Sequence, residues 1–151
     1  MHVKKKLTIL SNSADITHTN YVDLEYHNLR NIFDGEDAAF YELKLVSYQI
    51  PHSAKLSHII QVNIEGFAQP FSFDVSTKGP SRTVAFIASE YDGVLNNDNG
   101  GGDQPTCVIS KPSGNIFRVK LLNPHTSQLC NSANFANTWV MEFEISPVMC
   151  K

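Results

Sequence analysis

Histidine is the side chain best suited to both metal binding and proton transfer, and this chain of 151 residues has six of them. They are His2, His18, His27, His52, His58 and His125. No two follow the H-x-H or H-x-x-x-H spacing that places two imidazoles on one face of a strand or on one turn of a helix. His52 and His58 flank a single connection and could meet there, but surface or packing roles are the simpler expectation. The histidine pattern therefore predicts no metal site.

Three cysteines, Cys107, Cys130 and Cys150, show no metal-binding or redox spacing. Cys130 and Cys150 are expected to be ordinary thiols, because a nucleophilic cysteine needs a neighbouring base. The chain has no C-x-x-C pair, no N-x-S/T sequon and no apolar run of signal-peptide length after Met1. We therefore expect a protein that is made in a reducing compartment and is not secreted.

The glycine-rich segment Asn96–Asp103 (NNDNGGGD) contains carboxylates and amides of the kind that bind calcium. It lacks the D-x-[DN]-x-[DN]-G spacing that orients oxygens around that ion, so an exposed flexible loop is expected. No G-x-S-x-G nucleophile context and no phosphate-binding glycine loop occurs. The sequence thus predicts no catalytic, cofactor-binding or metal-binding residue, and a protein that is not an enzyme.

The bulk composition is that of one ordinary globular domain over residues 1–151, with 42% hydrophobic and 18% charged residues. A net charge of −3 argues against a basic nucleic-acid-binding face. The one basic run, Lys4–Lys6, is expected to be the solvated entry to a strand. No stretch approaches the ~20 apolar residues of a membrane-spanning helix.

Phe40–Ser53 (FYELKLVSYQIPHS) is the strand around which the others are expected to be arranged. Its apolar residues alternate through Tyr41, Leu43 and Leu45, which is typical of a half-buried strand. They then change phase, with Val46, Tyr48 and Ile50 as the next apolar set. This change predicts a bulge, a bend or burial on both faces, and Pro51 is expected to end the strand.

Similar but simpler patterns predict seven further main strands and one short extra strand. The main ones are Lys5–Leu10, Tyr21–Leu29, His58–Glu65, Pro70–Val75, Arg82–Ser89, Asn115–Leu122 and Asn137–Ser146, and the extra one is Thr106–Ser110. Eight antiparallel strands with no convincing helix predict an all-β fold, an eight-stranded antiparallel β-sandwich of the single jelly-roll type. The aromatic residues expected to point into its core are Phe71, Phe73, Phe86, Phe117, Trp139 and Phe143. Long polar loops are expected at Asn31–Ala39, Asp92–Pro105 and Asn123–Ala136.

The order of these segments resembles that of the small single-jelly-roll penton and minor capsid proteins of large double-stranded DNA viruses and virophages. In that group, a strand like Val22–Leu29 is followed by a run like Tyr41–Ser53 (YELKLVSYQIPHS) and then by a strand like Ile59–Ile64. Segments like Arg118–Asn123 (RVKLLN) and Thr138–Pro147 (TWVMEFEISP) come near the C-terminus. The stretch from Tyr41 to Pro51 carries most of the resemblance.

The resemblance implies a structural capsid protein that is assembled inside the host cell and resides in the virion. A single jelly roll of this length is similar to penton proteins, five of which close an icosahedral vertex, and a minor or cement protein between capsomers is the other role implied. The implied partners are further copies of the chain, as a homopentamer, together with the major capsid protein and other minor capsid proteins. A five-fold ring uses heterologous interfaces, in which one patch contacts a different patch on the next copy.

Two other functions stay open. A β-sandwich module that binds carbohydrate or a receptor would present exposed aromatic side chains, and Tyr48, Tyr91 and Phe135 are the aromatic residues expected outside the core. An enzyme of the cupin type would need an H-x-H pair and a following glutamate as metal ligands, and the sequence has no such set.

Overall fold

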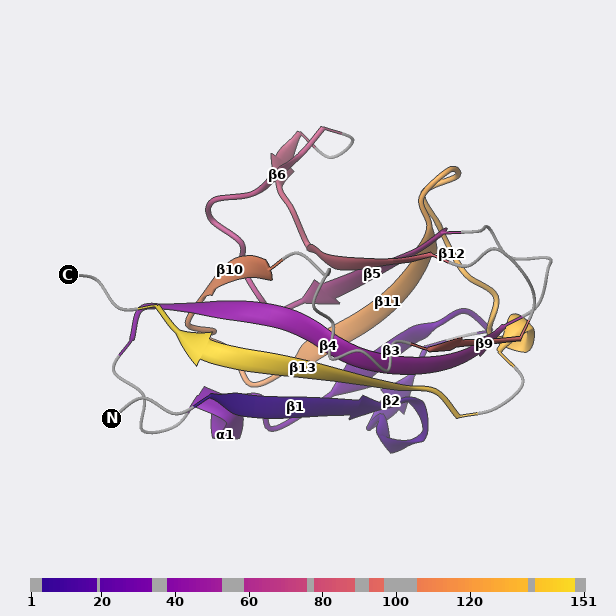
Figure 1. The fold of residues 1–151 in the computed structure, drawn as a ribbon, viewed down its shortest axis with the longest axis horizontal. Helices are drawn as coiled ribbons and strands as arrows, with labels where there is room; N and C mark the ends of the chain where they lie inside the picture. Colours follow the sequence, from indigo (N-terminus) through magenta and orange to yellow (C-terminus); the bar gives the residue numbers. More distant parts are fainter. Residues whose placement is uncertain are drawn as a thin grey trace.

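Two antiparallel β-sheets enclose a shared hydrophobic core in the computed structural model of this protein (Figure 1). The structure describes residues 4–18, 20–33, 38–52, 59–75, 78–88, 93–96, 106–135 and 138–148. Within these ranges, helical structure is limited to the four-residue turn α1 (Arg30–Phe33) and the 3₁₀ turns Ser11–Ser13 and Ser132–Asn134. The chain is therefore all-β, with the antiparallel sheets of a β-sandwich, as the sequence predicts.

The first sheet is built around the long strand predicted to be central. Its order is β1 (Lys5–Leu10), β13 (Val140–Pro147), β4 (Phe40–His52) and β10 (Thr106–Ser110), and β9 (Gly93–Asn96) pairs with the far end of β4. Since β4 has neighbours on both sides, its predicted interior position is confirmed. Its predicted end at Pro51 is one residue early, because β9 pairs with β4 through His52.

The second sheet packs against the first and contains shorter strands. Its order is β2 (Ile16–Thr17), β3 (Asp23–Tyr26), β11 (Phe117–Asn123), β5 (Ile59–Glu65) and β8 (Thr83–Ala88), and β12 (Gln128–Leu129) pairs with β11. The edges of this sheet are thus β2 on one side and β8 on the other. A hydrogen bond joins the two sheets directly, since the hydroxyl of Tyr26 donates to the carbonyl of Leu10 at 2.7 Å.

The phase change within β4 is a β-bulge opposite β13. Ser47 pairs with Glu142 and Leu45 pairs with Phe143, so Val46 is an extra residue with no partner in the register. Tyr41, Leu43 and Leu45 are buried before the bulge, and Ile50 is buried after it. The bulge keeps apolar side chains on the inner face along the whole strand, which confirms the first of the three predicted explanations.

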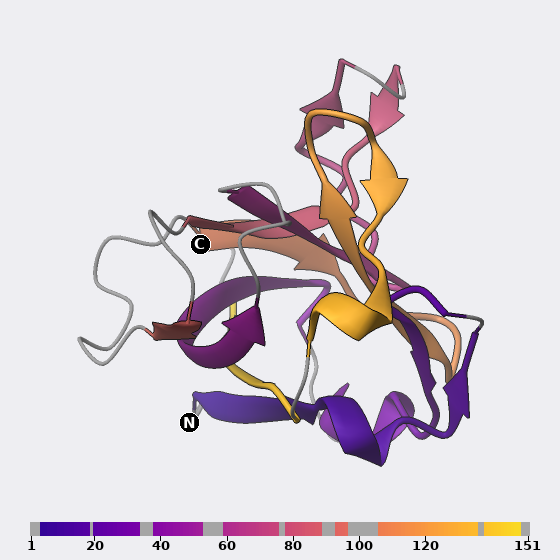
Figure 2. The same cartoon turned by 90° about the vertical axis from the view of Figure 1, so that its right-hand side faces the viewer.

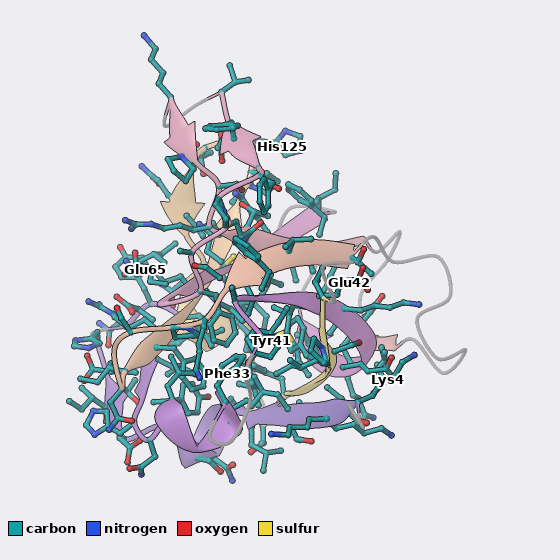
Figure 3. The ribbon with its side chains drawn as sticks, turned by 90° about the vertical axis from the view of Figure 1, so that its left-hand side faces the viewer. Lys4, Phe33, Tyr41, Glu42, Glu65 and His125 are labelled. Carbon is teal, nitrogen blue, oxygen red and sulfur yellow. The ribbon has the colours of Figure 1, made fainter. Side chains whose placement is uncertain are left out.

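The core lies between the sheets and follows the predicted alternation on most strands. Val119 and Leu121 on β11 and Val62 and Ile64 on β5 are each 0% exposed. Phe33 and Tyr41 point toward one another between the sheets, with ring centroids 4.8 Å apart (Figure 3). The predicted inward set of the last strand is also buried, namely Trp139 just before β13 and Met141, Phe143 and Ile145 within it.

Three aromatic residues predicted to be in the core are exposed instead. Phe71 is 65%, Phe73 74% and Phe86 51% exposed, and neighbouring Val75 is 91% exposed. The predicted strand Pro70–Val75 belongs to neither sheet, because it forms a separate hairpin in which β6 (Phe73–Asp74) pairs with β7 (Gly79–Pro80). Phe86 lies opposite Gln61, on the outer face of the second sheet, while its neighbours Ala85 and Ile87 face the core.

Several predicted loops contain short strands or turns. β2 lies in the predicted turn Ser11–Asn20, and β12 lies in the predicted loop Asn123–Ala136. β9 occupies Gly93–Asn96 of the predicted loop Asp92–Pro105, and the remainder of that loop lies outside the described residues. These short segments are strands because they pair with β3, β11 and β4. The local sequence does not show such pairing and therefore predicts loops there.

Candidate functional site

The residues best suited to chemistry are spread over the molecule. Of the histidines, His125 lies far from the other labelled residues, high on the β11–β12 hairpin (Figure 3). The side chains of His2, His52 and His58 lie outside the described residues, as do Tyr91 and Cys150. In the part of the chain that the structure describes, no three His, Cys, Asp or Glu side chains come together in a group that could hold a metal ion.

The two described cysteines have thiols that are hard to ionise. Burial raises the pKa of the Cys107 thiol to about 11 and that of the Cys130 thiol to about 11. Both thiols therefore stay protonated at neutral pH, where a nucleophilic cysteine would be a thiolate.

Two histidines that are distant in sequence meet at one glutamate. Glu25 on β3 lies 3.1 Å from His27 Nε2 and 3.8 Å from His18 Nε2. The backbone N–H of His27 also donates to Asp15 Oδ2 at 2.8 Å. The pairing of β2 with β3 brings these residues together, and the spacing of His18 and His27 gives no sign of it. The result is a small polar cluster at the β2 edge of the second sheet.

Ion pairs cover the outer face of the second sheet. Arg118 donates to both carboxylate oxygens of Asp23, at 3.1 and 2.6 Å, and Asp23 is only 6% exposed although its strand position predicts a wet side chain. Lys120 Nζ and Arg82 Nη1 lie 2.8 and 3.2 Å from Glu65 Oε1. Burial by itself would raise the pKa of Glu65, but the Lys120 hydrogen bond and the nearby cations outweigh it and lower that pKa.

The hairpin of β6 and β7 projects from the body of the molecule. We call it the arm and define it as residues 70–75 and 78–81 (Figures 1 and 2). Its base is fixed, since buried Gln69 donates through Nε2 to the carbonyl of Thr83 at 3.0 Å and the ring of Phe71 packs on Phe40 with centroids 5.3 Å apart. Phe73 and Val75 are therefore displayed to solvent on an anchored element.

A groove of about 440 Å³ runs between the arm and strands β8 and β10. Its apolar lining includes Phe73, Val75, Val84 and Phe86, and Cys107 contributes from β10. We call this the arm groove. Together with the arm it forms an apolar surface of the kind that marks an interaction site on a soluble protein.

A smaller apolar pocket lies at the opposite edge of the second sheet, and we call it the edge pocket. It measures about 190 Å³ and is lined in part by Thr17, Tyr21, Phe135 and Trp139. Tyr21 is 46% exposed, whereas Phe135, which was expected outside the core, is 9% exposed. The pocket is held by a reciprocal pair of hydrogen bonds, from Ser11 N–H to the Trp139 carbonyl and from Trp139 N–H to Ser11 Oγ, both 3.0 Å.

A second groove, polar in character, lies between the arm and the outer face of the second sheet. Its volume is about 440 Å³, and its lining includes Asn63, Glu65, Asp74, Arg82 and Lys120. The side chains of Asn63 and Thr83 are joined by a 2.8 Å hydrogen bond at its edge. The groove therefore brings acidic side chains, basic side chains and the Asn63 amide together in one depression of the surface.

Comparison with known proteins gives no further guide to these surfaces. No family model matches the chain, and no curated protein matches it. In the described residues, no helix has the length and apolar character needed to cross a membrane.

Proposed function

We propose that this protein is a structural subunit of a viral capsid, built as a single jelly roll that associates with copies of itself. The observation that carries the proposal is an anchored arm that displays Phe73 and Val75, which are 74% and 91% exposed. Burial of such side chains in an assembly is favourable by roughly 25 cal/mol per Å² of apolar surface. Contact with another protein chain is the simplest explanation for two apolar side chains that are so exposed to solvent.

The strand order supports the jelly roll. When the short strands β2, β6, β7, β9 and β12 are left out, eight strands remain in the described ranges. Numbered along the chain, they are arranged in one sheet in the order first, eighth, third, sixth. The other has the order second, seventh, fourth, fifth. This interleaving of early and late strands is what a double Greek key produces, and eight-stranded jelly rolls of this kind occur in viral capsid proteins, lectins and cupins.

The most specific role we propose is that of a penton protein, which forms a pentamer at an icosahedral vertex, with a minor capsid protein between capsomers as the second role. The partners would be further copies of the chain, the major capsid protein and other minor capsid proteins, and the site of action would be the virion. Exposed apolar surfaces at opposite edges of the second sheet suit such a ring, because closed rings use two different patches on each copy.

Negative-stain electron microscopy of the purified, concentrated chain tests this role. We expect ring-shaped particles with five-fold symmetry. Fields of separate single subunits at every concentration tried would contradict a penton role.

A β-sandwich module that binds carbohydrate or a receptor is the second candidate function. The polar groove supports it, because its volume falls in the range of small-ligand sites, roughly 300 to 1,000 Å³, and it combines the side chains of Asn63, Glu65 and Arg82. A glycan array probed with the purified chain tests this candidate. Saturable binding that is lost in Arg82→Ala would favour it over the capsid role, and no binding to any glycan would count against it.

A further inference from the structure

We propose that the arm of one copy inserts Phe73 and Val75 into the edge pocket of the next copy, so that copies associate head to tail. This inference rests on the proposed self-association and specifies which two surfaces meet. The arm lies on the chain between β5 and β8, at one edge of the second sheet, while the edge pocket is built on β2 and β3 at the other edge. Figures 1 and 2 show the arm rising on the side of the molecule away from β2.

The size of the edge pocket favours a side chain as its occupant. Sites for small organic ligands usually have volumes of roughly 300 to 1,000 Å³, and the edge pocket has about 190 Å³. Its aromatic lining from Tyr21, Phe135 and Trp139 suits an incoming phenyl ring, since aromatic pairs gain energy beyond the area they bury. A pocket that receives an apolar side chain from another copy of the same chain makes a heterologous contact.

The arm is suited to supply that side chain. Phe71 at its base is held against Phe40, which leaves Phe73 and Val75 as the most exposed apolar residues of the arm. An arm that is anchored at its base loses less conformational entropy on binding than a free segment would, so more of the burial energy is available for association. Contacts of this type, with an aromatic anchor in a pocket, typically dominate the energy of an interface.

One pair of opposite charges lies on the two surfaces, with Lys78 on the arm and Asp15 next to β2. Lys78 is exposed on the arm, close to β7, and its backbone N–H donates to the Asp74 carbonyl at 2.8 Å. Asp15 directly precedes β2, which contributes Thr17 to the pocket, whereas the side chain of Glu25 lies on the outer face of the sheet with His18 and His27. The exposed residue Ile16 adjoins the pocket residue Thr17 on β2 and adds apolar surface at the same edge of the sheet. The contact can therefore grow toward the ~1,000 Å² that a specific interface needs.

The test uses one variant of each surface and then mixes them. Phe73→Ser removes the aromatic side chain of the arm, and Thr17→Arg places a charged chain in the edge pocket. Each variant is measured by size-exclusion chromatography with light scattering, and its thermal unfolding is compared with that of the wild type. Ile116→Ser, at a side chain that is 49% exposed, and Thr8→Arg, on the outer face of β1, are the matched controls because neither lines the arm groove or the edge pocket.

We expect each surface variant to weaken self-association at least about tenfold, while both controls associate like the wild type. An equal mixture of the two variants should form a dimer and nothing larger. The Thr17→Arg copy still has an intact arm and the Phe73→Ser copy still has an intact pocket, so one contact can form between them. If Phe73→Ser unfolds, Val75→Ser at the 91% exposed position takes its place.

Three results would overturn the inference. Self-association that persists in both variants would show that other surfaces meet. A mixture that stays monomeric would show that the arm does not bind the edge pocket, since the mixture contains one copy with an intact arm and one with an intact pocket. A wild-type chain that never associates would overturn both the proposed self-assembly and this inference. Light scattering of the wild type alone identifies that outcome, so the two failures can be told apart.

Discussion

Trp139 links the core to the edge pocket. Its ring is 3% exposed, its backbone exchanges hydrogen bonds with Ser11, and its side chain also lines the pocket. A residue in this position serves stability and surface shape together, because a smaller side chain would leave a void under the pocket.

Trp139→Ala is expected to reduce the free energy of unfolding by ~3–5 kcal/mol, the usual cost of removing a large buried aromatic side chain. Denaturant unfolding followed by circular dichroism measures this cost. A loss below about 1 kcal/mol would mean that the ring contributes little to the core.

The carboxylate of Glu65 on the second sheet is expected to make the free energy of unfolding depend on pH. Its folded-state pKa is lowered, so its contribution to stability is present above the unfolded-state pKa and is lost as the pH falls through the folded-state pKa. Glu65→Gln should therefore cost about 0.5–1.5 kcal/mol at neutral pH, and the difference from wild type should shrink toward zero as the pH falls below ~4.

Urea unfolding of wild type and Glu65→Gln at a series of pH values measures that difference. Glu142→Gln is the matched control, because its partner Lys6 has a side chain that is 66% exposed and such surface pairs contribute ~1 kcal/mol or less. A difference between wild type and Glu65→Gln that stays constant from neutral to acid pH would show that the carboxylate charge is not the cause.

At the scale of secondary-structure elements, the bulge in β4 allows a strand of thirteen residues to keep its apolar side chains on one face, although their spacing changes at Val46. Deletion of Val46 would remove the extra residue and leave Leu45, Tyr48 and Ile50 in regular alternation. We expect this variant to fold, with a loss of about 0.5–3 kcal/mol. Deletion of Glu42 places either Tyr41 on the outer face or Lys44 on the inner face, and it should abolish cooperative unfolding. Thermal unfolding of both variants measures their melting temperatures and the cooperativity of the transition. Equal melting temperatures and equal cooperativity in the two variants would contradict this account of the bulge.

Gly66 ends β5 in a backbone conformation that other residues seldom adopt. Its φ is 111°, and a Cβ built there would lie 2.9 Å from the Ile116 carbonyl oxygen. Gly66→Ala should therefore cost ~1–3 kcal/mol. Gly114→Ala, with nothing within 4 Å of the added carbon, should change stability by less than ~0.5 kcal/mol. A shift in melting temperature that is equal for the two would exclude this strain.

Sequence patterns predicted the two-sheet architecture and the inner faces of most strands, because alternation records which side of a strand is buried. The pattern of Phe71, Phe73 and Val75 is just as regular, yet these residues are exposed, since alternation does not say whether anything covers the apolar face. The edge pocket was not predicted at all. It combines residues as distant as Ser11 and Trp139, and only the pairing of strands across the sheets brings them together.

At the scale of the whole molecule, the two apolar surfaces differ from one another and lie at opposite edges of the second sheet. Such a pair allows copies to associate head to tail. Contacts between unlike patches repeat from copy to copy, and they end in a ring when the rotation between copies closes. The proposed contact between the arm and the edge pocket is of this kind. We propose that copies of this protein close into a ring of five.

Light scattering of the purified wild-type chain, over a range of concentration and salt, measures its mass in solution and tests whether such a ring forms. We predict a species of five copies of the 16.8 kDa chain that replaces the monomer as the concentration rises. A mass that stays at one copy throughout, or that grows without limit in place of a closed ring, would contradict it.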